Sequence, residues 1–199
     1  MNLFDVYPLY DITPVKGSGV YVYEENGTEY LDLYGGHAVI SIGHSHPSYT
    51  KAICEQVQKL GFYSNSVHNP RQDEFAEKLE QVSGIRDYSL FLCNSGAEAN
   101  ENALKLASFH TGKSRIIYFE NAFHGRTSGV VAVTDNEAIK APFNTHNPVT
   151  KLAFEDLSGL EEALAKGDVA AVIVEVIQGV GGLDEATTEF YRSTSELCK

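Results

Sequence analysis

The residues best suited to chemistry form a short run, CNSGAEANE, between an apolar segment and a helix-like segment. Ser95 and Glu98 have the S-x-x-E spacing of a capping box, in which the serine accepts from a helix-start amide and the glutamate reaches back. Gly96 and Ala97 leave the first amides of that helix uncovered, and such amides bind phosphates and carboxylates. The run predicts either an ordinary capped helix or an anion site at its start.

Two later motifs add groups that suit a ligand site. NAFHGRT places Phe123, His124 and Arg126 after an apolar run, and VEVIQGVGG ends another apolar run in Glu175. Ligands of open α/β sheets bind beyond the carboxyl ends of the strands. An aromatic ring, a guanidinium group, a carboxylate and a phosphate-ready helix start at one sheet edge suit a flat phosphorylated cofactor and a carboxylate substrate.

Each of these side chains also has an ordinary structural interpretation. Phe123 can be a core aromatic, and His124 can hydrogen-bond a carbonyl group. Glu175 is flanked by apolar residues and needs a polar ligand or an arginine as partner if it is buried. The histidines of GHSHP have no further ligand cluster near them in sequence, so we interpret them as turn and cap residues and expect no metal site.

The elements that must position these groups follow from periodicity and turn residues. Residues 19–34 predict an antiparallel ribbon around Asn26-Gly27. Helices are predicted from Pro47, from Pro70, after Ser95 and from Thr187 or the next residue. The helix after Ser95 has a stripe of mostly small side chains, which we expect to lie close on a sheet: Ala99, Ala103, Leu106 and Ala107.

Four mostly apolar runs are predicted strands, at 89–93, 115–119, 129–134 and 169–177. Continuous apolar strands are buried on both faces, as in a parallel sheet covered by helices. The chain ends on a helix with no strand after it, which favours part of a larger doubly wound α/β sheet. The alternative is a complete small α/β domain.

The composition narrows the class of function. The chain has 199 residues with 15 basic and 27 acidic side chains, and this net charge of −12 argues against a nucleic-acid or anionic-membrane surface. No run approaches the roughly 18 apolar residues of a membrane span, and the N-terminal residues do not resemble a signal peptide, so we expect a cytoplasmic protein. Cys54, Cys93 and Cys198 are odd in number and widely spaced, which favours reduced thiols.

The motifs NSGAEANE, NAFHGRT and VEVIQGVGG, in this order and preceded by GHSHP, resemble the class III, pyridoxal-phosphate-dependent aminotransferases of fold type I. The resemblance runs from about Tyr7 to the last residue. It implies an N-terminal segment at 1–69 with a β-hairpin and a helix, and at 70–199 the first part of a large domain with a mostly parallel sheet flanked by helices. It implies that pyridoxal 5′-phosphate (PLP) is bound by Ser95, Gly96, Ala97, Phe123, His124 and Glu175.

The same resemblance implies a reaction and partners. Arg126 would bind a substrate carboxylate, and His37 would lie near the substrate side chain. Among class III enzymes the motifs are most similar to those that transfer the δ-amino group of an N-acetyl- or N-succinylornithine to 2-oxoglutarate in arginine biosynthesis, as homodimers whose sites are completed by residues 63–66 of the neighbour. Ornithine or 4-aminobutyrate aminotransferase is the near alternative, and a non-catalytic binding or dimerisation module is the distant one.

Two departures from the family pattern limit these expectations. Val180 stands where ornithine-type members commonly have a glutamate that pairs with a substrate-binding arginine. The family's Schiff-base lysine and the acid that pairs with the pyridine nitrogen both lie beyond residue 199. None of the ten lysines here stands in that context. We therefore expect this chain to hold no catalytic residue and to have no turnover by itself.

Overall fold

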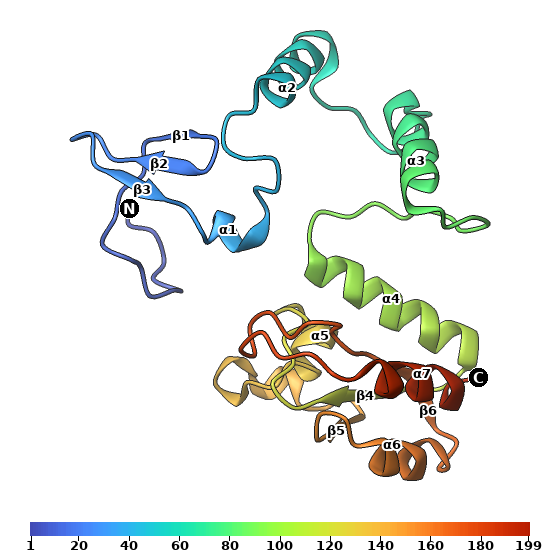
Figure 1. The fold of residues 1–199 in the computed structure, drawn as a ribbon. Helices are drawn as coiled ribbons and strands as arrows, with labels where there is room; N and C mark the ends of the chain where they lie inside the picture. The colour runs from blue at the N-terminus through green and yellow to red at the C-terminus, as the bar shows by residue number, and fades with distance from the viewer. The chain divides into compact units, whose positions relative to one another are not determined.

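The computed structural model describes residues 1–199, which divide into two compact units, Met1–Ile85 and Arg86–Lys199 (Figure 1). Each unit is described by itself. The predicted boundary between functional segments at residue 70 stays a prediction, because compact units and functional segments need not coincide. No helix in the structure combines the length and the apolar content that crossing a membrane requires.

The first unit begins with a three-stranded antiparallel sheet, in the order β1 (Lys16–Ser18), β2 (Tyr21–Tyr23) and β3 (Glu29–Leu31). This confirms the predicted ribbon. Its loop is longer than the expected two residues. The amide of Glu24 donates to the Thr28 carbonyl, and Gly27 has a φ of 87°. The loop therefore has three residues, a turn followed by Gly27 in the left-handed conformation, which glycine adopts without steric cost.

The helices of the first unit begin where the prolines predicted. After the short turn α1 (Gly35–Ala38), helix α2 spans Pro47–Leu60 and helix α3 spans Pro70–Ser83. The Asn69 side chain accepts a hydrogen bond from the amide of Arg71, the second residue of α3, and Gly84 ends that helix in a left-handed conformation. The predicted helix starts at the two prolines are confirmed, whereas the caps at Asn69 and Gly84 were not predicted.

The second unit alternates helices with a parallel sheet. Its elements are α4 (Gly96–Thr111), β4 (Arg115–Phe119), α5 (Ser128–Ala132), the 3-10 turns η1 (Glu137–Ile139) and η2 (Pro142–Asn144), β5 (Val149–Leu152), α6 (Leu157–Leu164), β6 (Val169–Val172) and α7 (Thr188–Leu197). The sheet order is β5-β4-β6, and Ile117 of the central strand pairs with Thr150 on one side and Val172 on the other. The predicted α/β class with a parallel sheet is confirmed.

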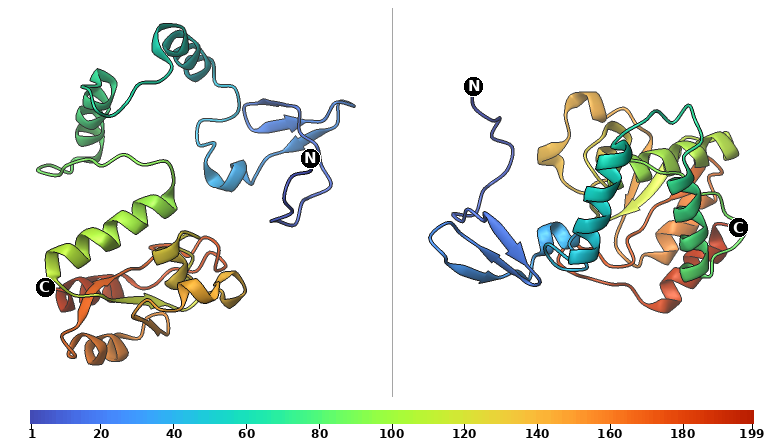
Figure 2. Two further views of the ribbon diagram at one scale, coloured as in Figure 1. Left: turned by 180° about the vertical axis from the view of Figure 1, so that it is seen from behind. Right: turned by 90° about the horizontal axis from the view of Figure 1, so that it is seen from above.

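Helices cover both faces of this sheet. Ile116 and Tyr118 of β4 pack with residues of α4 and α5, whereas Ile117 and Phe119 pack with residues of α6 and α7. The left panel of Figure 2 shows α4 and α6 on opposite sides of the strands. Successive side chains of a strand point to opposite faces, so the apolar run of β4 contributes to the core on both faces of the sheet.

Three predicted strands need correction. Residues 129–134 form most of α5 and its C-terminal end, because a short apolar run has the same composition in a buried helix turn as in a strand. Residues 89–93 are not a strand, since no other strand of the chain pairs with them. In the run 169–177 strand β6 ends at Val172, and β5 was not predicted from the sequence.

The small-residue stripe of α4 also lies on a different face from the one expected. The helix packs on the core through Ala97 and Leu104. Ala99, Ala103 and Leu106 lie on an exposed face instead. Positions 97 and 104 are two helical turns apart, so they form a second stripe beside the predicted one.

Replacing Phe190 with alanine tests the core between β4 and α7. The Phe190 ring is 1% exposed and meets Phe119 edge-on at 5.3 Å between centroids. We expect Phe190→Ala to lower the free energy of unfolding by about 3 to 5 kcal/mol, through lost burial and a cavity. Phe143→Ala is the control, because that ring is 77% exposed. Urea unfolding followed by circular dichroism measures both, and equal midpoints would contradict this packing.

Candidate functional site

The start of α4 is a capped helix, as predicted. The Ser95 hydroxyl oxygen accepts a hydrogen bond from the Glu98 amide at 3.2 Å. The Glu98 carboxylate in turn accepts from the amide of Asn94 and from the Ser95 hydroxyl, both at 3.0 Å. The two side chains therefore stabilise the helix start reciprocally, although the glutamate reaches the amide one residue before the cap.

The same helix start keeps two amides for another acceptor. The amides of Gly96 and Ala97 have no partner within the helix or from a side chain. A Cβ placed on Gly96 would meet no atom within 4 Å, so the approach is open. These amides and the helix dipole attract an anion, while the Glu98 carboxylate beside them repels one. An anion that binds here must displace or outweigh that carboxylate.

The second motif lies directly against α4. The Asn100 side-chain amide donates to the carbonyl of His124 at 2.9 Å. Gly125 comes so close that a Cβ there would lie 2.6 Å from the Ala97 Cβ, and its φ is 133°. Glycine is therefore required at this position on two grounds, contact and conformation. The motifs NSGAEANE and NAFHGRT form one packed unit.

Glu101, which the sequence analysis did not single out, joins the two motifs most firmly. Its carboxylate accepts from the Thr127 hydroxyl at 2.8 Å, from the amide of Gly129 at 2.9 Å and from the amide of Val130 at 3.0 Å. Thr127 is the N-cap of α5 and makes no cap of its own, so Glu101 caps that helix from outside. The sequence shows an acidic residue one turn after the capping box, which could have drawn attention to Glu101, but it does not indicate which groups would donate to this carboxylate.

The third motif is tied to the second. A carboxylate oxygen of Glu175 accepts from the Phe123 amide at 2.8 Å. Glu175 is half-buried, and its partner is this backbone amide, where the sequence led us to expect a polar ligand or an arginine. Gln178, which is buried, donates from its side-chain amide to the Glu120 carbonyl at 2.7 Å. A Cβ on Gly181 would lie 2.5 Å from the carbonyl oxygen of Asn121.

His124 is held through its backbone and buried at its ring. The amide of His124 donates to the Thr134 hydroxyl at 3.0 Å, and its side chain is 5% exposed. Burial lowers the pKa of the imidazole from 6.5 to about 4, so the ring is neutral near pH 7. Its Nε2 has no hydrogen-bond partner. Of the two interpretations of His124, a hydrogen bond to a carbonyl group is therefore not made through this nitrogen.

Arg126 and His37 are the two predicted substrate residues. Arg126 is exposed, between the buried Gly125 and the α5 N-cap. His37 belongs to the other compact unit, in a turn where its own φ is 62°. Its ring lies 4.8 Å from the Tyr34 ring. The structure therefore brings together the predicted cofactor residues, and it leaves the predicted roles of all these residues as predictions.

The assembled residues fit a phosphorylated ring compound on two observations. Free amides at an open helix start suit a phosphate group. The buried Nε2 of His124 and Oε1 of Gln178 lack partners, and buried polar atoms are usually satisfied. Phe123, which directly precedes His124 in the sequence, is half-buried and supplies an aromatic face.

Comparisons with known proteins agree with this arrangement. Residues 5–199 match the family described as Aminotransferase class-III. The acetylornithine aminotransferase of Bacillus anthracis is 42% identical over 199 residues, all of this chain and 51% of its own length. An N-acetylornithine aminotransferase structure from Stenotrophomonas maltophilia superposes with a TM-score of 0.78 at 35% identity, covering 96% of this chain and 48% of that one.

A third comparison concerns an ornithine aminotransferase from Toxoplasma gondii whose active site holds PLP at partial occupancy. It superposes with a TM-score of 0.86 at 28% identity and covers 98% of this chain and 47% of that one. The chain thus spans about half the length of the curated relatives and structures it matches. The matching part is the N-terminal half of the fold-type-I structures.

Removing the Glu101 carboxylate should loosen α5 from α4. We expect Glu101→Ala to lower the free energy of unfolding by about 2 kcal/mol, because two backbone amides and a hydroxyl lose a charged acceptor. Hydrogen exchange should accelerate at the amides of Gly129 and Val130. Glu162→Ala, at an exposed position of α6, is the matched control. Unchanged exchange at the two amides would show that this carboxylate does not hold them.

The buried His124 predicts a pH dependence of stability. The pKa of His124 is lower in the folded chain than in the unfolded chain, so unfolding takes up a proton at pH values between the two pKa values. The stability that this group contributes is therefore fully present above about pH 6.5 and is lost as pH falls toward about 4. When the pH is lowered from about 7 to about 4.5, we expect the free energy of unfolding of His124→Gln to fall by about 2 kcal/mol less than that of the unmodified chain. Urea unfolding at both pH values measures this, with the exposed His146→Gln as control. Equal losses in all three proteins would contradict a buried neutral imidazole.

Proposed function

Because this chain belongs to the class III aminotransferase family, we propose that it supplies the cofactor-binding part of a PLP-dependent aminotransferase acting on an N-acylated ornithine and 2-oxoglutarate. The proposed protein is cytoplasmic and serves arginine biosynthesis. The family is PLP-dependent, and the named relatives are acetylornithine and ornithine aminotransferases.

One observation carries this proposal: direct hydrogen bonds join the three motifs into a single framework. Asn100 reaches His124, Glu101 reaches Thr127, and Glu175 reaches Phe123. A capped helix alone would need none of these links. A site for a flat phosphorylated cofactor needs them, because the helix start and the aromatic residue must keep a fixed separation.

In this proposal each residue binds or orients, and none moves a proton at a reacting atom. The hydroxyl of Ser95 and the amides of Gly96 and Ala97 hold the phosphate. Phe123 covers one face of the ring, and the Glu175 carboxylate fixes the backbone that carries it. His124 contributes a neutral nitrogen in a buried setting. Bound PLP acts as the electron sink that allows an amino group to pass between substrates.

Arg126 and His37 are the proposed substrate residues. A guanidinium group binds a carboxylate through two parallel hydrogen bonds, which suits Arg126 for the carboxylate of either substrate. Val180 is exposed and apolar, so the chain places no carboxylate at that position to pair with a substrate-binding arginine. The near alternative is an ornithine or 4-aminobutyrate aminotransferase, in which Arg126 and His37 would bind an amino donor without the acyl group.

In this proposal, other polypeptide supplies the catalytic lysine, and a second subunit contributes further residues to the site. The lysine that binds the cofactor covalently is outside this sequence, so the chain alone is a binding half. The complete enzyme is proposed to be a homodimer in which residues 63–66 of one subunit reach the neighbouring site. In this structure those residues are exposed, and the hydroxyls of Ser64 and Ser66 lie 3.0 Å apart.

Mixing the 199-residue chain with PLP tests the binding role. We expect saturable binding by equilibrium dialysis, competed by inorganic phosphate, because the helix-start amides recognise the phosphate group. With N-acetylornithine and 2-oxoglutarate added, no glutamate should form. Glutamate formation would place the catalytic lysine within this chain, and absence of PLP binding would favour a non-catalytic module.

Gly96→Val separates the anion site from the helix cap. The Cβ position at Gly96 is open, so the substitution should leave the fold intact while its branched side chain covers the free amides. We expect PLP affinity to fall about tenfold or more. Gly96→Ala is the matched control, with a smaller loss, and Ser95→Ala should cost about 1 kcal/mol of stability through the lost cap. Equal PLP affinity in all variants would mean that the run only caps a helix.

A further inference from the structure

The segment 121–125, which carries Phe123 and His124, has an unusual backbone. Asn121 has a φ of 60° and Gly125 a φ of 133°, so both ends of the segment lie in conformations that most residues avoid. Such conformations persist where the surrounding structure holds them in place. The segment forms neither a helix nor a strand, so groups outside it must fix the position of the two rings.

Thr134, just beyond the C-terminal end of α5, holds the second half of this segment. Its hydroxyl oxygen accepts a hydrogen bond from the His124 amide at 3.0 Å. The same hydroxyl donates toward the carbonyl oxygens of Gly125 and Val130, which lie 3.1 and 3.0 Å away. This side chain is 1% exposed, so a residue of the same size without a hydroxyl would leave buried backbone groups without partners.

Asp135, the next residue, holds the first half of the segment. Its amide donates to the Ala122 carbonyl at 2.8 Å, and one of its carboxylate oxygens accepts from the Asn121 amide at 2.9 Å. The other carboxylate oxygen binds the Lys151 ammonium group of β5 at 3.0 Å. Burial alone would raise the pKa of Asp135, but the Asn121 amide and Lys151 outweigh burial and lower that pKa, so the carboxylate is charged near pH 7. Asp135 therefore fastens the segment to the neighbouring strand.

Together with the Glu175 carboxylate on the Phe123 amide, these contacts bind a backbone group of every residue from 121 to 125. A side chain that must keep one orientation needs a backbone held in this way. We propose that Thr134 and Asp135 are positioning residues of the proposed cofactor site, which set the orientation of the Phe123 ring against the cofactor ring and leave recognition of the phosphate to the start of α4. The inference rests on the proposed function, because it concerns how the same site holds the ring.

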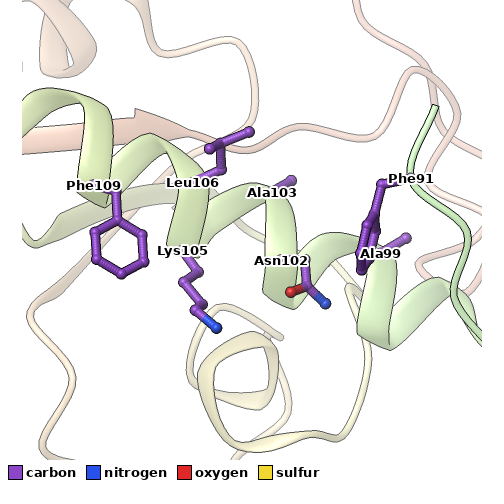
Figure 3. Close-up of a pocket in the computed structure, with 7 residues that line it drawn as sticks. All are labelled: Phe91, Ala99, Asn102, Ala103, Lys105, Leu106 and Phe109. Atoms are coloured by element: carbon purple, nitrogen blue, oxygen red, sulfur yellow. The ribbon is translucent and has the colours of Figure 1, made fainter. Parts of the chain in front are cut away.

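An apolar hollow on α4 offers an aromatic ring a different seat. It has a volume of about 480 Å³, and its largest apolar side chains are Phe91, Leu106 and Phe109 (Figure 3). None of its lining residues belongs to the segment 121–125. None of them has a buried polar atom without a partner, whereas His124 in the segment has one. The segment therefore suits a ring that carries polar groups better than the hollow does, and the two seats predict different effects of substitution.

Binding of pyridoxamine 5′-phosphate to the 199-residue chain tests the inference. This compound has the ring and the phosphate of PLP but no aldehyde, so it cannot bond covalently to lysine side chains. A ring that a chiral site holds in one orientation acquires circular dichroism at its own absorption band, and this signal per bound molecule reports orientation separately from affinity. Affinity for inorganic phosphate, measured by calorimetry, reports the helix start alone.

We expect Thr134→Val to bind pyridoxamine 5′-phosphate about tenfold more weakly, because a well-placed aromatic contact contributes as much as about a factor of ten. Its dichroism per bound molecule should fall, while its affinity for inorganic phosphate should be unchanged. Asp135→Ala should behave in the same way. Thr134→Ser keeps the hydroxyl and should restore both the affinity and the dichroism. Thr111→Val is the matched control, because its hydroxyl donates to the Ala107 carbonyl at the other end of α4.

A purely structural role would lower the stability of Thr134→Val against urea and leave the dichroism per bound molecule unchanged, and this result would overturn the inference. Equal losses of affinity for phosphate and for pyridoxamine 5′-phosphate would also overturn it. If Thr134→Val does not fold, Asp135→Ala decides, since the Asp135 side chain is 18% exposed and its loss disturbs the core less.

Two further outcomes separate this inference from the proposed function. Loss of the dichroism in Phe109→Ala, at a ring that is 76% exposed, but not in Thr134→Val would place the cofactor ring in the hollow on α4 and refute the positioning role alone. An unmodified chain that binds neither compound would refute the proposed binding role, and the inference with it.

Discussion

The arrangement of the candidate site depends on one carboxylate, that of Glu101 on α4. It accepts hydrogen bonds from Thr127, Gly129 and Val130, and thereby fixes the start of α5 against the first turns of α4. Because α5 has only five residues, it has little intrinsic stability and depends on this external cap. The segment between Phe123 and Thr127 is then held at both ends, by Glu175 on one side and by Glu101 on the other. Close contact between Gly125 and Ala97 leaves no space for the segment to shift toward the helix.

The helix start shows how one local structure serves stability and accommodates binding. The Glu98 carboxylate completes the cap with Ser95 and also places a negative charge where an anion would be attracted. Stability of the free chain and affinity for a phosphate therefore oppose each other at this point. An anion at this helix start would therefore compete with the Glu98 carboxylate for the same donors.

The second unit has a filled core, but some of its apolar side chains are exposed at the surface. Both faces of β4 are filled, and its core includes fully buried side chains such as Ile117 and Val130. Around this core, Leu106 and Phe109 of α4 are exposed, and β6 is an edge strand of the sheet. The chain spans about half of the length of the matched proteins, and its own hydrogen bonds bring the three motifs together.

The sequence by itself determined the elements whose signals are local. Prolines and polar caps set the starts of α2, α3, α4 and α7, a glycine set the ribbon turn, and a five-residue apolar run set β4, because each depends on residues within one or two turns. The motifs also determined the family. Only the tertiary structure decided the rest. Residues 129–134 became mostly helix and 89–93 stayed unpaired, since an apolar run fits a buried helix or a strand equally and a strand needs a partner. Glu101 could not be assigned from sequence, because its hydrogen-bond donors lie more than twenty residues away and are mostly backbone amides, which every residue except proline carries.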